Sequence, residues 1–296
     1  RMSILRRLFW APLLALFLAS AAHGESVSIE VPRSSGIQNS SSLTADLRIP
    51  DGASAKVPAV VILHSAGGVD GTATPYIEQL NKAGIGTLEV EMFSRGGAIP
   101  LGNSLPYAYA SLAFLAKHPK VDPARIGVAG FSYGGALSIL SASEETTKTF
   151  TGGAYRFMAH VSLYTICWIP GAISAGTTDL GRYVNGFMRG ISPTMYQRLT
   201  GAPILLLAGE KDDYDDPDSC TQFVNGLPTD AKKSYTVVVY PGAHHGWDSP
   251  TDKNYNDPAS HKGRGGKVSH IGDRQIATKS RENLVAFLKQ HLGAKP

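Results

Sequence analysis

The sequence has little net charge, and this limits the partners that the chain can bind. Charged residues make up 18% of its 296 positions, and the formal net charge is +4. The first 24 residues contain Arg1, Arg6 and Arg7 and no acidic residue, so their removal would leave a net charge of +1. A nearly neutral chain lacks the basic surface that nucleic-acid binding requires. We therefore expect a small-molecule substrate and no nucleic-acid partner.

Long hydrophobic runs are also scarce. The longest apolar stretch, residues 8–19, contains Pro12 and is too short to cross a bilayer. Basic residues precede it, and Ala22-His23-Gly24 supplies small residues at the spacing of a cleavage site. This pattern predicts a signal peptide over residues 1–24, export to the periplasm or the medium, and no stable membrane insertion after cleavage. A retained N-terminal anchor helix is the alternative.

Cysteine occurs only twice, at Cys167 and Cys220. An even count in an exported protein permits one disulfide. Cys167 follows the strand-like residues 158–164 and Cys220 follows an acidic loop, so both are expected beyond neighbouring strand ends. We expect a disulfide that holds this loop, and two buried free thiols are the alternative.

The chain has no internal repeat and no low-complexity linker, which favours a single domain over residues 25–296. Strand-like and helix-like stretches alternate, and this is typical of a mainly parallel sheet with helices on both faces. Two segments fit no element of such a scaffold. We interpret residues 168–200 as a cap or pocket wall, with surface packing as the alternative, and residues 249–273 as a loop.

The most informative motif is Gly130-Phe131-Ser132-Tyr133-Gly134, which lies between an apolar strand and a predicted helix. In a G-x-S-x-G elbow the serine sits on a tight turn, and the backbone N–H that follows it helps to hold an oxyanion. The motif predicts Ser132 as nucleophile and Tyr133 as one oxyanion donor. A glycine-rich connection with a bystander serine is the alternative.

The acid and the base that such a serine needs follow in the order serine, acid, histidine. The apolar strand 203–208 is followed by Gly209 and then Asp212, and the strand 235–240 leads to His245. We predict a triad of Ser132, Asp212 and His245, because carboxyl ends of parallel strands meet at one edge of the sheet. Asp213 and His244 are the alternatives for acid and base.

Five aspartates occur between Asp212 and Asp218, so a calcium site is conceivable. The EF-hand spacing is absent, and a solvated acidic loop that also carries the triad acid is the favoured interpretation. We expect neither a metal nor an organic cofactor.

The second oxyanion donor is expected after the apolar strand 57–63, where His64-Ser65-Ala66-Gly67-Gly68 follows. Ala66 is the predicted donor, and His64 is expected to brace this loop. Three further residues are tentative substrate contacts, with core packing or a salt bridge as their alternative roles: Arg95, Tyr164 and Trp247.

Four motifs together resemble the dienelactone hydrolase family of α/β-hydrolases, over about residues 45–292. They are His64–Gly68, Gly130–Gly135, Gly209–Asp213 and Tyr240–Asp248. The resemblance implies an α/β-hydrolase fold and cleavage of esters or lactones without a cofactor; the family also often carries an arginine near position 95. The founding enzymes use a cysteine nucleophile and a glutamate in the oxyanion loop, where this chain has Ser132 and Ser65. This departure favours serine-esterase chemistry over dienelactone as substrate.

We therefore expect an exported serine esterase. A serine peptidase of prolyl-oligopeptidase type has the same triad order but normally carries a propeller domain, for which no segment is available here. A non-catalytic binding protein on the same fold is the third possibility. The sequence does not specify the acyl group, the alcohol or the oligomeric state.

Overall fold

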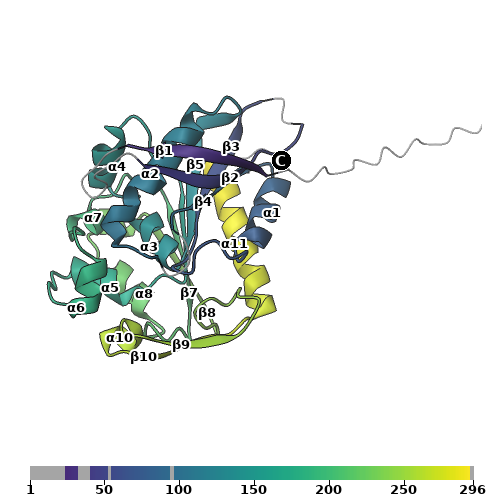
Figure 1. The fold of residues 1–296 in the computed structure, drawn as a ribbon. Coiled ribbons are helices and arrows are strands. Elements are labelled where there is room, and N and C mark those ends of the chain that lie inside the picture. The colour runs from purple at the N-terminus through teal and green to yellow at the C-terminus, as the bar shows by residue number, and fades with distance from the viewer. Residues whose placement is uncertain (1–23, 33–40, 53–54, 94–96, 294–296) are drawn as a thin grey trace, which may run out of the picture.

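The computed structural model describes residues 24–32, 41–52, 55–93 and 97–293. The predicted signal peptide, except for Gly24, and Arg95 therefore lie outside the described residues. An eight-stranded sheet runs through the centre of the molecule in the order β1-β2-β4-β3-β5-β6-β7-β8 (Figure 1). Its strands are β1 (Glu25–Val31), β2 (Ser41–Arg48), β3 (Val57–Leu63), β4 (Gly86–Glu91), β5 (Val121–Phe131), β6 (His160–Leu163), β7 (Ile204–Gly209) and β8 (Tyr235–Tyr240).

The sheet is antiparallel only at one edge, where β2 pairs with both β1 and β4. From β4 to β8 all neighbours are parallel. Every residue of β3 and β7 is buried, as expected for strands that are covered on both faces. The carboxyl ends of these parallel strands lie at one edge of the sheet, and the turns that carry the candidate site begin there.

Helices cover both faces of the sheet, as the sequence predicts (Figure 1). On one face α1 (Thr74–Lys82) packs beside α11 (Arg274–Leu292). The other face carries α2 (Leu101–Lys117), α3 (Tyr133–Leu140) and α8 (Ser219–Asn225), and α4 (Glu144–Thr151) packs on α2. The one-turn α9 (Thr229–Lys232) leads into β8. The apolar side chains form two core clusters, one on each side of the sheet.

Residues 168–200 contain three short helices, α5 (Trp168–Ser174), α6 (Arg182–Phe187) and α7 (Thr194–Gln197). They lie together at one end of the molecule (Figure 1). Their inward side chains belong to the larger core cluster, so this segment is packed against the scaffold.

The prediction of a plain loop over residues 249–273 is wrong. The segment forms a two-stranded antiparallel sheet, β9 (Lys253–Asp257) with β10 (Gly266–His270), joined through α10 (Ser260–Gly263). Its strands are mostly exposed, with Val268 as their one fully buried residue, so no hydrophobic alternation marks them in the sequence. The acid loop holds this sheet, because the Asp213 carboxylate accepts the Ser269 N–H at 2.7 Å.

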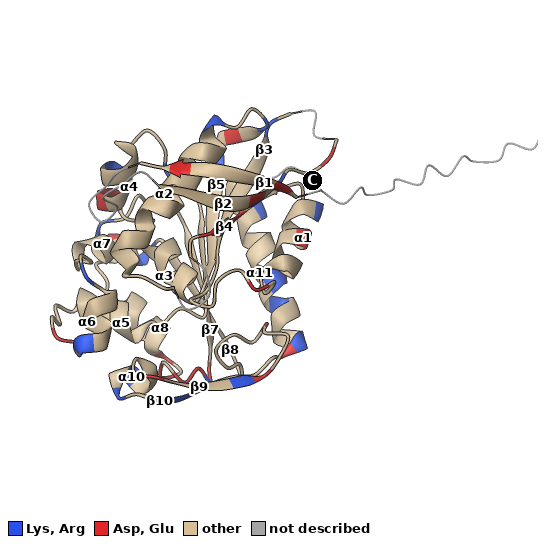
Figure 2. Ribbon diagram, in the orientation of Figure 1, with Lys and Arg blue, Asp and Glu red and all other residues tan. Residues whose placement is uncertain are grey.

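Acidic and basic residues are interspersed over the outer elements (Figure 2). The central strands β3 and β7 contain no charged residue. Among the described residues no helix combines the length and apolarity needed to cross a membrane.

Candidate active site

Ser132 lies on the turn from β5 into α3, with a strained backbone of φ 51° and ψ −107°. This turn leaves no room for side chains on its flanks. A Cβ at Gly130 would overlap the backbone of Gly134, and a Cβ at Gly134 would overlap the carbonyl of Leu63. The glycines therefore permit a close approach, and the turn lifts the Ser132 hydroxyl above the end of the sheet.

Ser132, His245 and Asp212 form one hydrogen-bonded chain. The Ser132 Oγ lies 2.9 Å from the His245 Nε2, and the His245 Nδ1 lies 2.7 Å from the Asp212 Oδ2. His245 is 1% exposed and Asp212 is 6% exposed, so both are shielded from water. The other Asp212 oxygen accepts the Tyr214 N–H at 3.0 Å. A buried carboxylate on Nδ1 leaves Nε2 free to accept the serine proton.

The alternative acid and base do not take part in this chain. The Asp213 carboxylate points to the Ser269 N–H of β10 instead of to a histidine. The Nδ1 of His244 is buried without a hydrogen-bond partner among the described residues, and His244 contacts neither Ser132 nor an acid by a hydrogen bond there. The structure thus brings together the three residues that the sequence favours.

Ala66, in the loop after β3, lines the same two cavities as Ser132. The Ser65 hydroxyl accepts the Gly67 N–H, and the Ser65 carbonyl accepts the Gly68 N–H, each at 3.1 Å. His64 braces the loop, since its Nδ1 donates to the Ser65 carbonyl at 2.7 Å and its Nε2 accepts the Met92 N–H at 3.0 Å. Burial lowers the pKa of His64, which favours the neutral ring that this pattern needs.

Two cavities meet at Ser132. One has a volume of about 130 Å³ and the other about 510 Å³. They share four lining residues: Ala66, Ser132, Tyr214 and Asp257. His245 lines the larger cavity only, whereas Tyr133 lines the smaller one. The cap prediction placed residues 168–200 over the site, and Ile169, Tyr183 and Phe187 from this segment do line the smaller cavity.

The tentative substrate contacts are placed differently from one another. Tyr164 lines the larger cavity, but its hydroxyl is held by Asp248 at 2.9 Å. Trp247 lines neither cavity: its indole is fully buried between Tyr164 and Tyr240, and its N–H donates to Ser280 at 3.1 Å. The prediction of substrate contact for Trp247 is therefore wrong, because the ring packs in the core behind the histidine.

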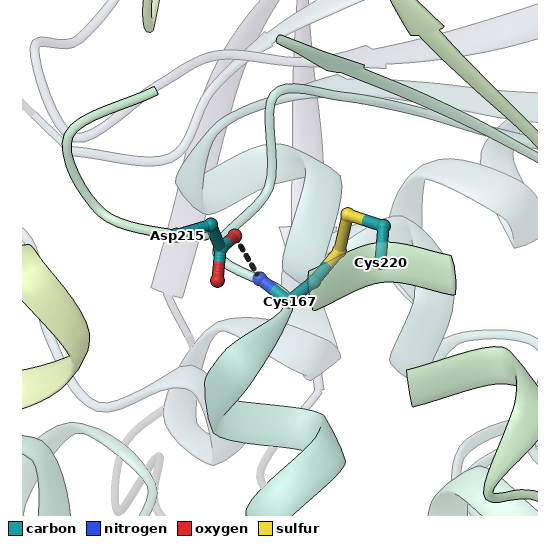
Figure 3. A group of neighbouring side chains, drawn as sticks. All are labelled: Cys167, Asp215 and Cys220. Atoms are coloured by element: carbon teal, nitrogen blue, oxygen red, sulfur yellow. Dashed lines mark hydrogen bonds between the residues drawn. A yellow bond between two sulfur atoms is a disulfide. The ribbon is translucent and has the colours of Figure 1, made fainter. Parts of the chain in front are cut away.

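Cys167 and Cys220 form the predicted disulfide, which links the start of α5 to α8 (Figure 3). Asp215 lies beside it and accepts the N–H groups of Cys167 at 2.6 Å and Trp168 at 2.8 Å. Burial, together with the charge of Asp212, raises the pKa of Asp215 to about 7.

The aspartate-rich loop does not form a cation cage in the described structure. Its carboxylates diverge: Asp212 holds His245, Asp213 holds Ser269, and Asp216 pairs with Lys262 at 2.9 Å. The group that comes nearest to metal-ligand spacing is Cys167, Asp215 and Cys220, and its two sulfurs are already bonded to each other. Asp212 is the buried carboxylate of this loop, at the position expected for the triad acid.

No motif in the sequence indicates the hydroxyl network that lies beside the histidine. Tyr214 donates to Asp257 at 2.8 Å, and the Tyr255 hydroxyl lies 3.1 Å from that of Tyr214 and 2.9 Å from the Nε2 of His270. The ring of His270 packs against His245 with centroids 5.0 Å apart. Burial, with the nearby charges of His245 and Lys253, lowers the pKa of His270 to about 3. These residues come mostly from the segment predicted as a loop, so no motif marked them.

The sequence of this chain matches a known protein family. The sequence profile of the dienelactone hydrolase family matches residues 43–269. The chain belongs to this family. This membership confirms the predicted α/β-hydrolase fold, and it supports a hydrolytic enzyme.

Two solved structures share the fold. A structure titled as a putative dienelactone hydrolase from Klebsiella pneumoniae superposes with a TM-score of 0.63 at 17% identity, covering 90% of this chain and 99% of that one. Est1E from Butyrivibrio proteoclasticus gives a TM-score of 0.61 at 19% identity, with the same coverages of 90% and 99%. A curated relative from Bacillus subtilis (strain 168), the uncharacterized peptidase YuxL, is 28% identical over 142 residues. That alignment covers 44% of this chain and 20% of the relative.

Proposed function

We propose that this chain is an exported carboxylic ester hydrolase that forms an acyl-enzyme on Ser132. The observation that carries this proposal is the hydrogen-bonded chain from Asp212 through His245 to Ser132, which ends where two cavities meet. A serine hydroxyl becomes an effective nucleophile only when a neighbouring base takes its proton. Here the base is His245, which lies between the acid Asp212 and the nucleophile Ser132.

The proposed reaction has two halves. Ser132 attacks the ester carbonyl while His245 takes its proton, and the N–H groups of Tyr133 and Ala66 stabilise the oxyanion. His245 then gives the proton to the leaving alcohol. Water, activated by His245, releases the acid and restores Ser132. Asp212 stabilises the charged imidazole in both halves.

The test is hydrolysis of p-nitrophenyl acetate, butyrate and octanoate by the purified protein and its Ser132→Ala variant. We expect kcat/KM to fall by at least about 10⁴-fold in the variant. A variant that folds normally and keeps wild-type turnover would overturn the proposal.

A peptidase is the second candidate, because the curated relative is described as one. Amide and ester substrates share the same triad chemistry, so the leaving group separates the two functions. Assay of p-nitroanilides of short peptides beside the p-nitrophenyl esters decides between them. Hydrolysis of anilides without hydrolysis of esters would favour the peptidase. A binding protein would hydrolyse neither and would resist labelling by an organophosphate.

Export is part of the proposal, with residues 1–24 as signal peptide. The disulfide supports it, because disulfides persist mainly in oxidising compartments. Expression of the full chain in a bacterium, followed by fractionation and N-terminal sequencing, tests it. We expect a mature chain that begins at Glu25 in the periplasm or the medium. An uncleaved chain in the cytoplasm or the membrane would contradict it.

A further inference from the structure

The two sides of Ser132 differ in chemistry. In the smaller cavity Asp257 is the one charged lining residue, and the walls are chiefly aliphatic and aromatic side chains such as Ile139, Ile169, Val184 and Met188. The larger cavity is rich in polar groups, and residues that contribute them are Asp70, Thr72, Glu89, Lys253, Asn254 and Tyr255. One half of a bound substrate is thus placed among apolar groups and the other half among hydrogen-bonding groups.

The position of His245 decides which half of an ester enters which cavity. The imidazole must protonate the leaving oxygen, so the alcohol has to lie on the side that His245 lines. His245 lines the larger cavity and not the smaller one. The water that hydrolyses the acyl-enzyme must also approach His245 from this side. The acyl group is left for the smaller, apolar cavity.

We propose, on the basis of the ester hydrolysis proposed above, that the larger cavity binds an uncharged, hydroxyl-rich alcohol. The substrate class is an ester that joins an apolar acyl group to a sugar or another polyol. The size of the two cavities, about 130 Å³ against about 510 Å³, places the larger part of the substrate on the alcohol side.

The charges of the larger cavity argue against an anionic alcohol such as a phosphorylated one. Carboxylates outnumber the single lysine among its lining residues; they are Asp70, Glu89, Asp248 and Asp257. Burial lowers the pKa of His270 and of His64, so these rings do not offset the negative charge near neutral pH. An added phosphate would meet net repulsion here.

A cationic alcohol is also disfavoured, because two of these carboxylates are already engaged. Asp248 accepts the hydroxyls of Tyr76 at 2.8 Å and Tyr164 at 2.9 Å. Asp257 accepts the hydroxyl of Tyr214 at 2.8 Å. These bonds direct two of the four carboxylates toward fixed protein donors. The remaining polar wall combines Asp70 and Glu89 with the Lys253 ammonium group, the Asn254 amide and the Thr72 hydroxyl, so it offers both donors and acceptors to an uncharged alcohol.

Tyr255 supplies a surface for the apolar face of a sugar ring. It is one of few exposed large hydrophobic residues in the described structure, at 36% exposure, and it lines the larger cavity. Lys253 and Asn254 precede it on β9 and line the same cavity, where they add donors and an acceptor. The hairpin 253–270 is therefore the proposed specificity element for the alcohol.

The experiment compares two butyrate esters whose alcohols share a six-membered ring and an exocyclic CH₂–O group but differ in the ring oxygen and the ring hydroxyl groups. We expect kcat/KM for 6-O-butyrylglucose to exceed that for cyclohexylmethyl butyrate by about tenfold or more, since several hydrogen bonds form only with the sugar. Equal rates, or faster cleavage of the cyclohexylmethyl ester, would overturn the proposal. Butyrylcholine is a third substrate with a cationic alcohol. If it is cleaved faster than both other esters, the cavity is a site for cations and the proposal is overturned.

A matched pair of variants locates the preference. Asn254 and Asn256 lie on the same exposed strand, but only Asn254 lines the cavity. Asn254→Ala should lower the ratio of sugar ester to cyclohexylmethyl ester by about threefold to tenfold, and Asn256→Ala should change it by less than about twofold. Equal effects of both variants would contradict the assignment to the hairpin. Hydrolysis of p-nitrophenyl butyrate without a sugar preference would overturn this inference alone, whereas inactivity toward every ester would overturn the proposed function with it.

Discussion

The turns at the strand ends and the two peripheral segments, residues 168–200 and 249–273, have different roles in this molecule. Ser132, Asp212 and His245 lie in the turns that follow β5, β7 and β8, and the pairing of these strands in one sheet sets their relative positions. Residues 168–200 and 249–273 form short helices and an exposed hairpin outside the eight-stranded sheet. Asp213 attaches the hairpin segment, because its carboxylate accepts the Ser269 N–H and its carbonyl accepts the His261 N–H. We infer that the turns at the strand ends carry the catalytic residues, and that the segments outside the sheet determine selectivity.

The adjacent aspartates Asp212 and Asp213 give the sharpest test of this division. Asp212→Asn should lower kcat by about 10³ to 10⁴-fold, because the amide cannot hold and stabilise the charged imidazole. Asp213→Asn replaces the charged acceptor of the Ser269 N–H by a neutral amide oxygen, which weakens the hold on the hairpin, and should lower kcat by less than about tenfold. Steady-state kinetics with p-nitrophenyl butyrate measure both. Losses of equal size would contradict the separation of the two roles.

The sequence allowed prediction of the scaffold because its signals are local. Buried parallel strands such as 203–208 appear as continuous apolar runs, and Gly130 and Gly134 mark the turn at Ser132. The hairpin was missed because its residues are mostly exposed and carry no alternation. The contact between His270 and His245 depends on how that hairpin folds back over the site, which no local pattern encodes.

The disulfide joins a peripheral segment to the scaffold, so its removal should affect stability more than catalysis. Cys167 and Cys220 are separated by 53 residues. The double variant Cys167→Ser/Cys220→Ser should lose about 3 to 4 kcal/mol of unfolding free energy, because the unfolded chain regains loop entropy. Urea denaturation measures this loss, and reduced wild-type protein is the control. A change below about 1 kcal/mol would show that the link adds little.

The floor of the larger cavity should make stability depend on pH. Burial raises the pKa of Asp248 to about 6, so the folded state binds more protons than the unfolded chain between about pH 4 and pH 6. The contribution of Asp248 to the free energy of unfolding therefore falls as the pH rises through that window. The unfolding free energy of Asp248→Asn minus that of the wild type should rise by up to about 3 kcal/mol from pH 4 to pH 7. A difference that stays flat or falls in urea titrations would contradict the buried carboxyl.

The smallest expected effect concerns the apolar cavity. Phe187 lines it from α6, and Phe187→Ala should enlarge the space for the acyl chain. We expect the ratio of kcat/KM for p-nitrophenyl octanoate over butyrate to rise by about threefold to tenfold. Phe114→Ala is the matched control, because Phe114 lines neither cavity at Ser132. An unchanged ratio in Phe187→Ala would place the acyl chain elsewhere.

Mass spectrometry after reaction with an organophosphate tests whether Ser132 forms a covalent intermediate. With paraoxon we predict one diethylphosphoryl group per chain, located on the peptide that contains Ser132 and absent from Ser132→Ala. Unmodified wild-type protein, or a label that persists in the variant, would contradict it.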